Sequence, residues 1–254
     1  MRLLLRDFTC KENLFDSLLL YIIVTLMSFT IKTISTPIDK PDLYISASSD
    51  VEASDYQIIL DAIRRISNEV KSKLRHQSFG AFNYSNEEYG SADWYIEHCR
   101  LSNGQVDAEK LLGLFREEPY QTKAPHKDVF ITDQDLTFPS THFVFGASNC
   151  GNMVLSTHRF KDLESRQKQK VLQLLSAHEM GHIFGLVTRA NNAHEALGRH
   201  CLGEKGACLM EQMNVRGCKT IERLSNLVIP HRNWLCEDCQ REIAQHRTKA
   251  EITF

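Results

Sequence analysis

Apolar residues recur at helical spacing in three stretches of the chain. The first predicts an amphipathic helix over residues 55–76, and the second a helix over residues 107–118, which Asp107 can cap and Pro119 ends. The third stretch, residues 164–185, is apolar around most of the circumference of a helix. A helix with so little polar surface is predicted to be buried.

Short strands are expected between these helices. The candidates are residues 127–132, 142–145 and 152–157. Residues 77–93 carry Gly, Asn and Ser among scattered aromatics, which indicates an exposed loop. Beyond Gly185 the regular patterning fades. The alternation predicts one α/β or α+β domain with a small, irregular C-terminal subdomain.

Composition and charge exclude several classes of protein. Hydrophobic residues make up 42% and charged residues 24% of the 254 residues, which excludes a disordered or fibrous chain. The formal net charge is -2, whereas a nucleic-acid-binding domain should be clearly basic, so we expect no nucleic-acid partner. The chain has no apolar run of about 18 residues, which excludes a polytopic membrane protein.

The N-terminal segment, residues 1–40, admits three interpretations. Residues 17–31 are uncharged and follow Arg2, Arg6 and Lys11. They can form a first core helix that leads into a strand, the apolar part of a signal peptide, or a membrane anchor. The run is short for a membrane span, and no A-x-A-like cleavage site follows it. With the core helix preferred, we expect an intracellular, cytoplasmic protein, and secretion or membrane anchoring is the alternative.

The third helix carries the motif His178-Glu179-Met180-Gly181-His182. Two histidines four residues apart lie on one helical face, so both imidazoles can reach a single Zn²⁺. The glutamate can take a proton from a zinc-bound water, whose pKa the metal has already lowered. A chance match is the alternative, but these polar side chains are costly to bury unless a metal offsets the cost.

A third zinc ligand is expected after the helix. In metzincins a glycine three residues beyond the second histidine breaks the helix, and a third histidine follows three residues later. Gly185 matches this pattern, but Thr188 occupies the histidine position. Treating residues 188–199 as an insertion brings His200 into register. We prefer His200 to His194, because His200 is joined directly to Cys201, which we expect to bind a second, structural metal ion. A ligand on a segment fixed in this way loses less conformational entropy on binding zinc.

Cysteine motifs complete the pattern. His200 is followed by Cys201, then by Cys208-Leu209-Met210, and then by Cys236-Glu-Asp-Cys239. Together with the helix motif, these residues resemble the archaemetzincin family of zinc metallopeptidases, which belongs to the metzincin class. The resemblance covers roughly residues 129–239 and includes stretches upstream of the helix.

The resemblance implies a metzincin-like α/β (α+β) fold, with a mixed twisted sheet, an active-site helix and a small irregular C-terminal subdomain. It places a catalytic domain at residues 41–239, before a polar tail at residues 240–254. It also implies two zinc ions per chain. The implied site residues are His178, His182 and His200 for the catalytic zinc, Glu179 as general base, Met210 in the turn beneath the metal, and Cys201, Cys208, Cys236 and Cys239 for a structural zinc.

The implied function is hydrolysis of peptide bonds by a zinc-bound water that Glu179 activates, with an aminopeptidase-like preference for short peptides. The partner is then a peptide substrate, which we expect to lie along an edge strand at residues 142–145. Two alternatives remain. One is a catalytically inactive zinc-binding protein, which the displaced third histidine favours, and the other is an interaction protein organised by the four cysteines. The oligomeric state is not predicted.

The four cysteines also indicate zinc by their own chemistry. Cys236 and Cys239 can chelate a metal through two thiolates, and Cys201 and Cys208 supply the second pair of a tetrahedral site. Two disulfides are the alternative, favoured if the N-terminal segment is a secretion signal. The other cysteines have no obvious partner and are expected to be small hydrophobes or surface thiols.

Overall fold

The computed structural model describes residues 42–72, 75–81, 91–117, 126–139, 141–148, 151–186, 208–211 and 218–250, which belong to one compact unit, Pro41–Phe254. Residues 1–40, for which three interpretations were open, lie outside the described residues, and so do His194, His200 and Cys201. Within the described part of the chain, no helix is both long and apolar enough to cross a membrane.

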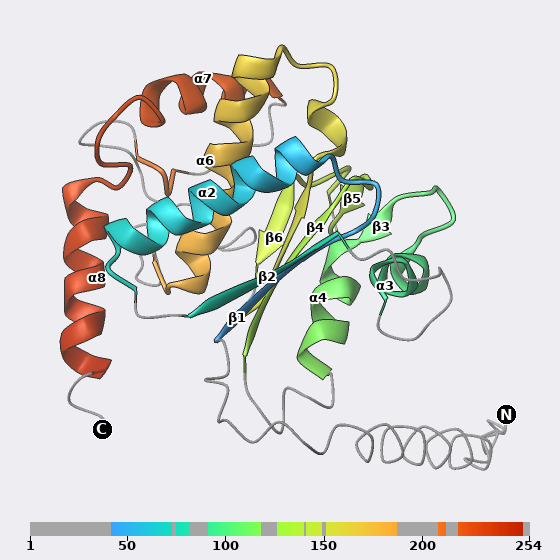
Figure 1. Cartoon of the computed structure of the whole chain (residues 1–254), viewed down its shortest axis with the longest axis horizontal. Coiled ribbons are helices and arrows are strands. Elements are labelled where there is room, and N and C mark those ends of the chain that lie inside the picture. Colours follow the sequence, from blue (N-terminus) through green and yellow to red (C-terminus); the bar gives the residue numbers. More distant parts are fainter. Residues whose placement is uncertain are drawn as a thin grey trace, which may run out of the picture. The chain divides into compact units, whose positions relative to one another are not determined.

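A mixed sheet of five strands, ordered β2-β1-β4-β7-β6, lies at the centre of the described residues (Figure 1). Four strands are parallel: β1 (Leu43–Ala47), β2 (His76–Ala81), β4 (Lys127–Thr132) and β7 (Met153–Ser156). The last strand, β6 (Gly146–Ser148), runs antiparallel to β7 and forms an edge of the sheet. A separate parallel pair consists of β3 (Val106–Asp107) and β5 (Leu136–Thr137).

Helices pack against two hydrophobic cores that share the strands of the sheet. The first core includes residues of α2 (Ala53–Glu69), α6 (Ser165–Ile183), α7 (Cys218–Val228) and α8 (Glu237–Ala250). The second includes residues of α3 (Ala92–Cys99) and α4 (Ala108–Glu117). Successive strand residues alternate between the two, because neighbouring side chains point to opposite faces of a sheet. In β4, for example, Val129 and Ile131 join the first core and Phe130 joins the second.

Several predicted elements are confirmed closely. Strand β4 has the predicted bounds, and α6 matches the predicted buried helix, with the Glu164 side chain accepting a hydrogen bond from the Gln167 N–H at 3.2 Å. The predicted cap of α4 is also present, because Asp107 Oδ1 accepts from the Lys110 N–H at 3.0 Å. These elements have strong local signals, namely apolar periodicity and a capping side chain.

Two predictions in the first half of the chain are wrong. The helix expected over residues 55–76 ends at Glu69, and Lys71 turns the chain with a φ of 50° before β2 begins at His76. The loop expected over residues 77–93 contains most of β2 and the start of α3, which the Ser91 side chain caps. Val70 and Leu74 continue the apolar spacing beyond the last residue of the helix, so periodicity alone misplaced the boundary.

Two further regions differ from expectation. The edge strand predicted at residues 142–145 is wrong: Val144 forms an isolated bridge to Leu136, and the edge strand is β6, which follows it. The C-terminal region is also more regular than expected, because α7 and α8 occupy most of residues 218–250. Helix α7 buries Ile221, Leu224 and Val228, a short apolar stripe in a largely polar sequence.

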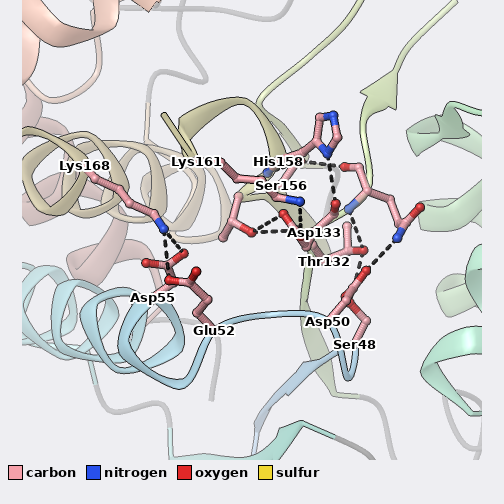
Figure 2. A network of polar contacts seen from close by, with 12 residues as sticks. Ser48, Asp50, Glu52, Asp55, Thr132, Asp133, Ser156, His158, Lys161 and Lys168 are labelled. Carbon is pink, nitrogen blue, oxygen red and sulfur yellow. Dashed lines mark hydrogen bonds and ion pairs between the residues drawn. The ribbon is translucent and has the colours of Figure 1, made fainter. Parts of the chain in front are cut away.

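Polar contacts lie at the carboxyl ends of β4 and β7, and a separate ion pair joins α6 to α2 (Figure 2). Asp133, after β4, accepts from Thr157 Oγ1 at 3.1 Å and pairs with Lys161 at 2.5 Å. On α6, Lys168 pairs at 2.7 Å with the buried Asp55 of α2. Burial raises the pKa of Asp55, and the ion pair with Lys168 opposes that effect. The ion pair of Lys168 with Asp55 holds α6, which carries the histidine motif, against α2.

Candidate active site

The last turns of α6 bring the two motif histidines together. His178 is buried and His182 is half-buried, and their Nε2 atoms are 3.3 Å apart, with the ring planes at 86°. Two nitrogen ligands at about 2.0–2.1 Å from one tetrahedral zinc ion lie about 3.3–3.4 Å from each other. The separation of the two Nε2 atoms therefore fits a shared zinc ion.

A backbone carbonyl orients the first histidine. The Leu209 carbonyl accepts a hydrogen bond from His178 Nδ1 at 2.8 Å, and both residues are buried. Because a carbonyl oxygen can only accept, Nδ1 carries a proton, and in the neutral ring Nε2 then keeps its lone pair. Such a hydrogen bond fixes the ring of a metal ligand and raises its basicity.

Gly185 ends the helix as the metzincin pattern requires. Its φ of 76° lies in the left-handed region, which a residue without a Cβ adopts without strain. The N–H groups of Gly185 and Leu186 donate to the carbonyls of His182 and Gly181 at 2.9 and 3.0 Å. Helix α6 thus ends at Ile183, one residue after the second histidine, which keeps His182 in its last turn.

The predicted Met-turn residue packs directly against the motif. Met210 is fully buried, and a Cβ built on Gly181 would overlap its Sδ atom and approach a side-chain carbon of Leu186 at 3.3 Å. The glycine inside the motif therefore permits the close approach of the turn that carries Leu209 and Met210.

Replacing Gly181 with alanine is expected to lower the free energy of unfolding by about 1–3 kcal/mol, because the new Cβ would overlap the Sδ atom of the buried Met210, whose side chain must then shift. Gly113→Ala on α4 is the matched control, since a Cβ there meets nothing within 4 Å. The control should be neutral or stabilising by up to about 1 kcal/mol. Urea unfolding of the two variants gives the comparison, and equal stabilities would contradict this packing.

The side chain of Glu179, inside the motif, contacts the edge strand β6. Its carboxyl Oε2 accepts a hydrogen bond from Ser148 Oγ at 2.8 Å, and a Cβ on Gly146 would lie 3.2 Å from its Cγ. Burial raises the pKa of Glu179 to about 7, while the hydrogen bond from Ser148 acts in the opposite direction. A carboxyl group in this range can take up and release a proton near neutral pH.

Three of the four predicted cysteine ligands come together. The Sγ atoms of Cys208, Cys236 and Cys239 lie within 4.8 Å of one another, and those of Cys208 and Cys239 are 3.7 Å apart. Two thiolates at about 2.3 Å from one tetrahedral zinc are about 3.8 Å apart, so this separation fits a metal and is far longer than a disulfide bond. Among the described residues, these three cysteines form no disulfide with one another. The fourth predicted ligand, Cys201, is outside the described residues.

The turn Cys208–Met210 serves both groups of ligands. Cys208 contributes its thiol to the cysteine cluster, Leu209 orients His178, and Met210 packs on Gly181. Sequence reasoning missed the contributions of Leu209 and Ser148. A sequence does not show which group a backbone carbonyl binds, and a lone serine in a short strand belongs to no recognisable motif. His200, the predicted third histidine, and its competitor His194 lie outside the described part of the chain.

No family model and no curated protein sequence matches the chain. Among solved structures, the archaemetzincin of Methanopyrus kandleri is similar, with a TM-score of 0.57 and 19% identity over 85% of this chain and 99% of that one. A zinc-dependent peptidase from Methanocorpusculum labreanum has a TM-score of 0.50 and 18% identity over 79% and 99% of the two chains. The chain therefore has the fold of the archaemetzincins, and the resemblance found in its motifs is confirmed at the level of the fold. The predicted mixed α/β fold class is confirmed as well.

Proposed function

We propose that the chain is a zinc metallopeptidase that hydrolyses peptide bonds. The observation that carries the proposal is the His178–His182 pair, whose Nε2 atoms are 3.3 Å apart beside the buried carboxyl group of Glu179. His178 and His182, with His200 as the third ligand, would hold the catalytic zinc. The archaemetzincin fold supports this role, because it is shared with a protein described as a zinc-dependent peptidase.

Zinc in this position would polarise the scissile carbonyl and lower the pKa of a water molecule. Glu179 would act as the general base, with its Oε2 held in place by Ser148 while it accepts a proton. His178 would stay in one tautomer, because its Nδ1–H group remains bonded to the Leu209 carbonyl. The burial of both residues keeps bulk water away from these hydrogen bonds.

The substrate would lie along β6, the edge strand nearest the carboxyl group of Glu179. Among the strands of the described residues β6 pairs only with β7, so an extended peptide could add to its other side as a further strand. Ser148 of β6 also holds Glu179, so a peptide on this strand would pass close to the base. The aminopeptidase-like preference for short peptides rests on the family resemblance.

The cysteine cluster would hold a second, structural zinc. Cys208, Cys236 and Cys239 supply three thiols at suitable distances, and we propose Cys201 as the fourth ligand. The Cys236 N–H donates to Cys208 Sγ at 3.4 Å, and such a contact stabilises a thiolate over a thiol. This site would fix the turn that carries Leu209 and Met210.

A library of short peptides incubated with the purified full chain tests the activity. Zinc-loaded protein is expected to release residues from the amino termini, a chelator should stop the release, and added zinc should restore it. Mass spectrometry of the products identifies the bonds that are cut. Internal cleavage would contradict the aminopeptidase-like preference alone. No cleavage by protein that holds two zinc ions would contradict the peptidase and favour a binding or interaction protein.

A further inference from the structure

A carboxylate at the end of α2 holds the segment that precedes Cys236. Glu69 Oε1 accepts hydrogen bonds from the backbone N–H groups of Trp234 and Leu235, both at 3.0 Å, and Oε2 lies 3.2 Å from the Trp234 nitrogen. Trp234 and Leu235 are buried. Hydrogen bonds to an ionised acceptor are stronger than neutral ones, so this contact restrains the backbone next to the cysteine.

A second side chain of α2 holds the same segment from its other end. Arg65 donates to the carbonyls of His231 and Arg232 at 2.7 and 3.3 Å, and its guanidinium carbon lies 3.8 Å from the centre of a Trp234 ring. Glu69 and Arg65 lie one helical turn apart, on the same face of α2. This face therefore binds the backbone of residues 231–235 through both N–H and C=O groups.

The position of Glu69 is unfavourable for the helix itself. It is the last residue of α2, where a negative charge opposes the helix dipole, and the last turn of this helix has no basic residue. Helix stability therefore gives no reason for a carboxylate at this position. Its two hydrogen bonds to the segment before Cys236 do give one.

Hydrogen bonds continue from this segment to the histidine site. The Trp234 carbonyl accepts from the Leu209 N–H at 2.8 Å, and the Leu209 carbonyl accepts from His178 Nδ1 at 2.8 Å. Leu209 thus uses both of its backbone polar groups in this relay, and it follows Cys208 of the cysteine cluster directly.

We propose that Glu69 is a positioning residue for both metal sites: it fixes the Trp234–Leu235 backbone, which places Cys236 against Cys208 and, through Leu209, sets the ring of His178. The proposal rests on the proposed function only for the identity of the metal. It concerns metal affinity, so it can fail or hold whether or not the chain cleaves peptides.

The test compares Glu69→Ala and Glu69→Gln with Asp61→Ala in the full chain. Asp61 is a matched control, because it is an exposed carboxylate of the same helix that contacts Gln57 and Arg64. Chelator competition gives the Kd for zinc at each site, and the same titration with His182→Ala or Cys239→Ala added shows which Kd belongs to which site. Thermal unfolding is recorded in parallel.

Glu69→Ala is expected to raise the zinc Kd about tenfold at both sites, in the range found for residues that orient metal ligands. Glu69→Gln keeps one acceptor oxygen and should raise both constants about threefold, and Asp61→Ala should change neither. A lower Tm with unchanged Kd values would overturn the proposal, since a purely structural role predicts that result. A change of the zinc Kd at the cysteine site alone would overturn the proposed effect of Glu69 on His178 through Leu209. If Glu69→Ala does not fold, Glu69→Gln decides, and unchanged constants for that variant overturn the proposal.

Discussion

Replacing Glu179 with alanine is expected to reduce peptide hydrolysis by about 10²- to 10⁴-fold, the usual contribution of a general base. The carboxyl group lies next to the histidine pair and is bonded to Ser148, so its loss should leave the metal ligands in place. Zinc analysis of the variant should therefore give the same metal content as the parent chain. The measurement is the initial rate on a peptide that the library experiment identifies.

Two controls make this result specific. Glu109→Ala removes an exposed carboxylate from α4 and should leave the rate unchanged. Ser148→Ala removes only the hydrogen bond to Glu179 and should lower the rate less than Glu179→Ala does. If Glu179→Ala and the parent turned over substrate at comparable rates, Glu179 would not be the base.

Removing one thiol of the cysteine cluster is expected to have the largest effect on stability. Cys239→Ala should lose one zinc equivalent per chain and lower Tm by about 10 °C or more, because a structural zinc contributes directly to folding free energy. Cys239 is buried beside Cys208 at 3.7 Å, so no water can replace its sulfur easily. Calorimetry and metal analysis of the same sample give both quantities.

Cys99→Ala is the matched control for this loss. Cys99 is an equally buried free thiol in α3, outside the cluster, and burial raises its pKa to about 11, so it remains a neutral thiol. Its removal should cost about 1 kcal/mol, or about 2–4 °C in Tm, with no change in zinc content. Finding Cys236 or Cys239 in a disulfide by mass spectrometry of unreduced protein would contradict the structural zinc.

The elements with a strong local pattern could be predicted from the sequence. Helix α6 is apolar on most sides and carries a motif whose spacing is set by the helical repeat, so its bounds and the meeting of His178 with His182 followed directly. Strand β2 was not predicted, because its sequence His-Gln-Ser-Phe-Gly-Ala contains a glycine and few β-branched or aromatic residues. It lies at an edge of the sheet, where a weak strand pattern is sufficient.

The chemistry of the site was predictable only where side chains carry it. The five residues of the two clusters, His178, His182, Cys208, Cys236 and Cys239, were recognised by their metal-binding side chains. The connection between the clusters runs through the backbone of Leu209 and Trp234, and backbone groups are the same at every position of a chain. The hydrogen bonds of Glu69 could not be predicted from the sequence either, since its partners are backbone N–H groups about 165 residues away along the chain.

Anomalous diffraction at the zinc edge from crystals of the full chain tests the central claim most directly. The account predicts two peaks per chain, one bonded to the Nε2 atoms of His178 and His182, and one among the sulfurs of Cys208, Cys236 and Cys239. The first peak should also show His200 as its third protein ligand. A cysteine-bound peak with no zinc between the two histidines, in crystals grown with excess zinc, would contradict the account.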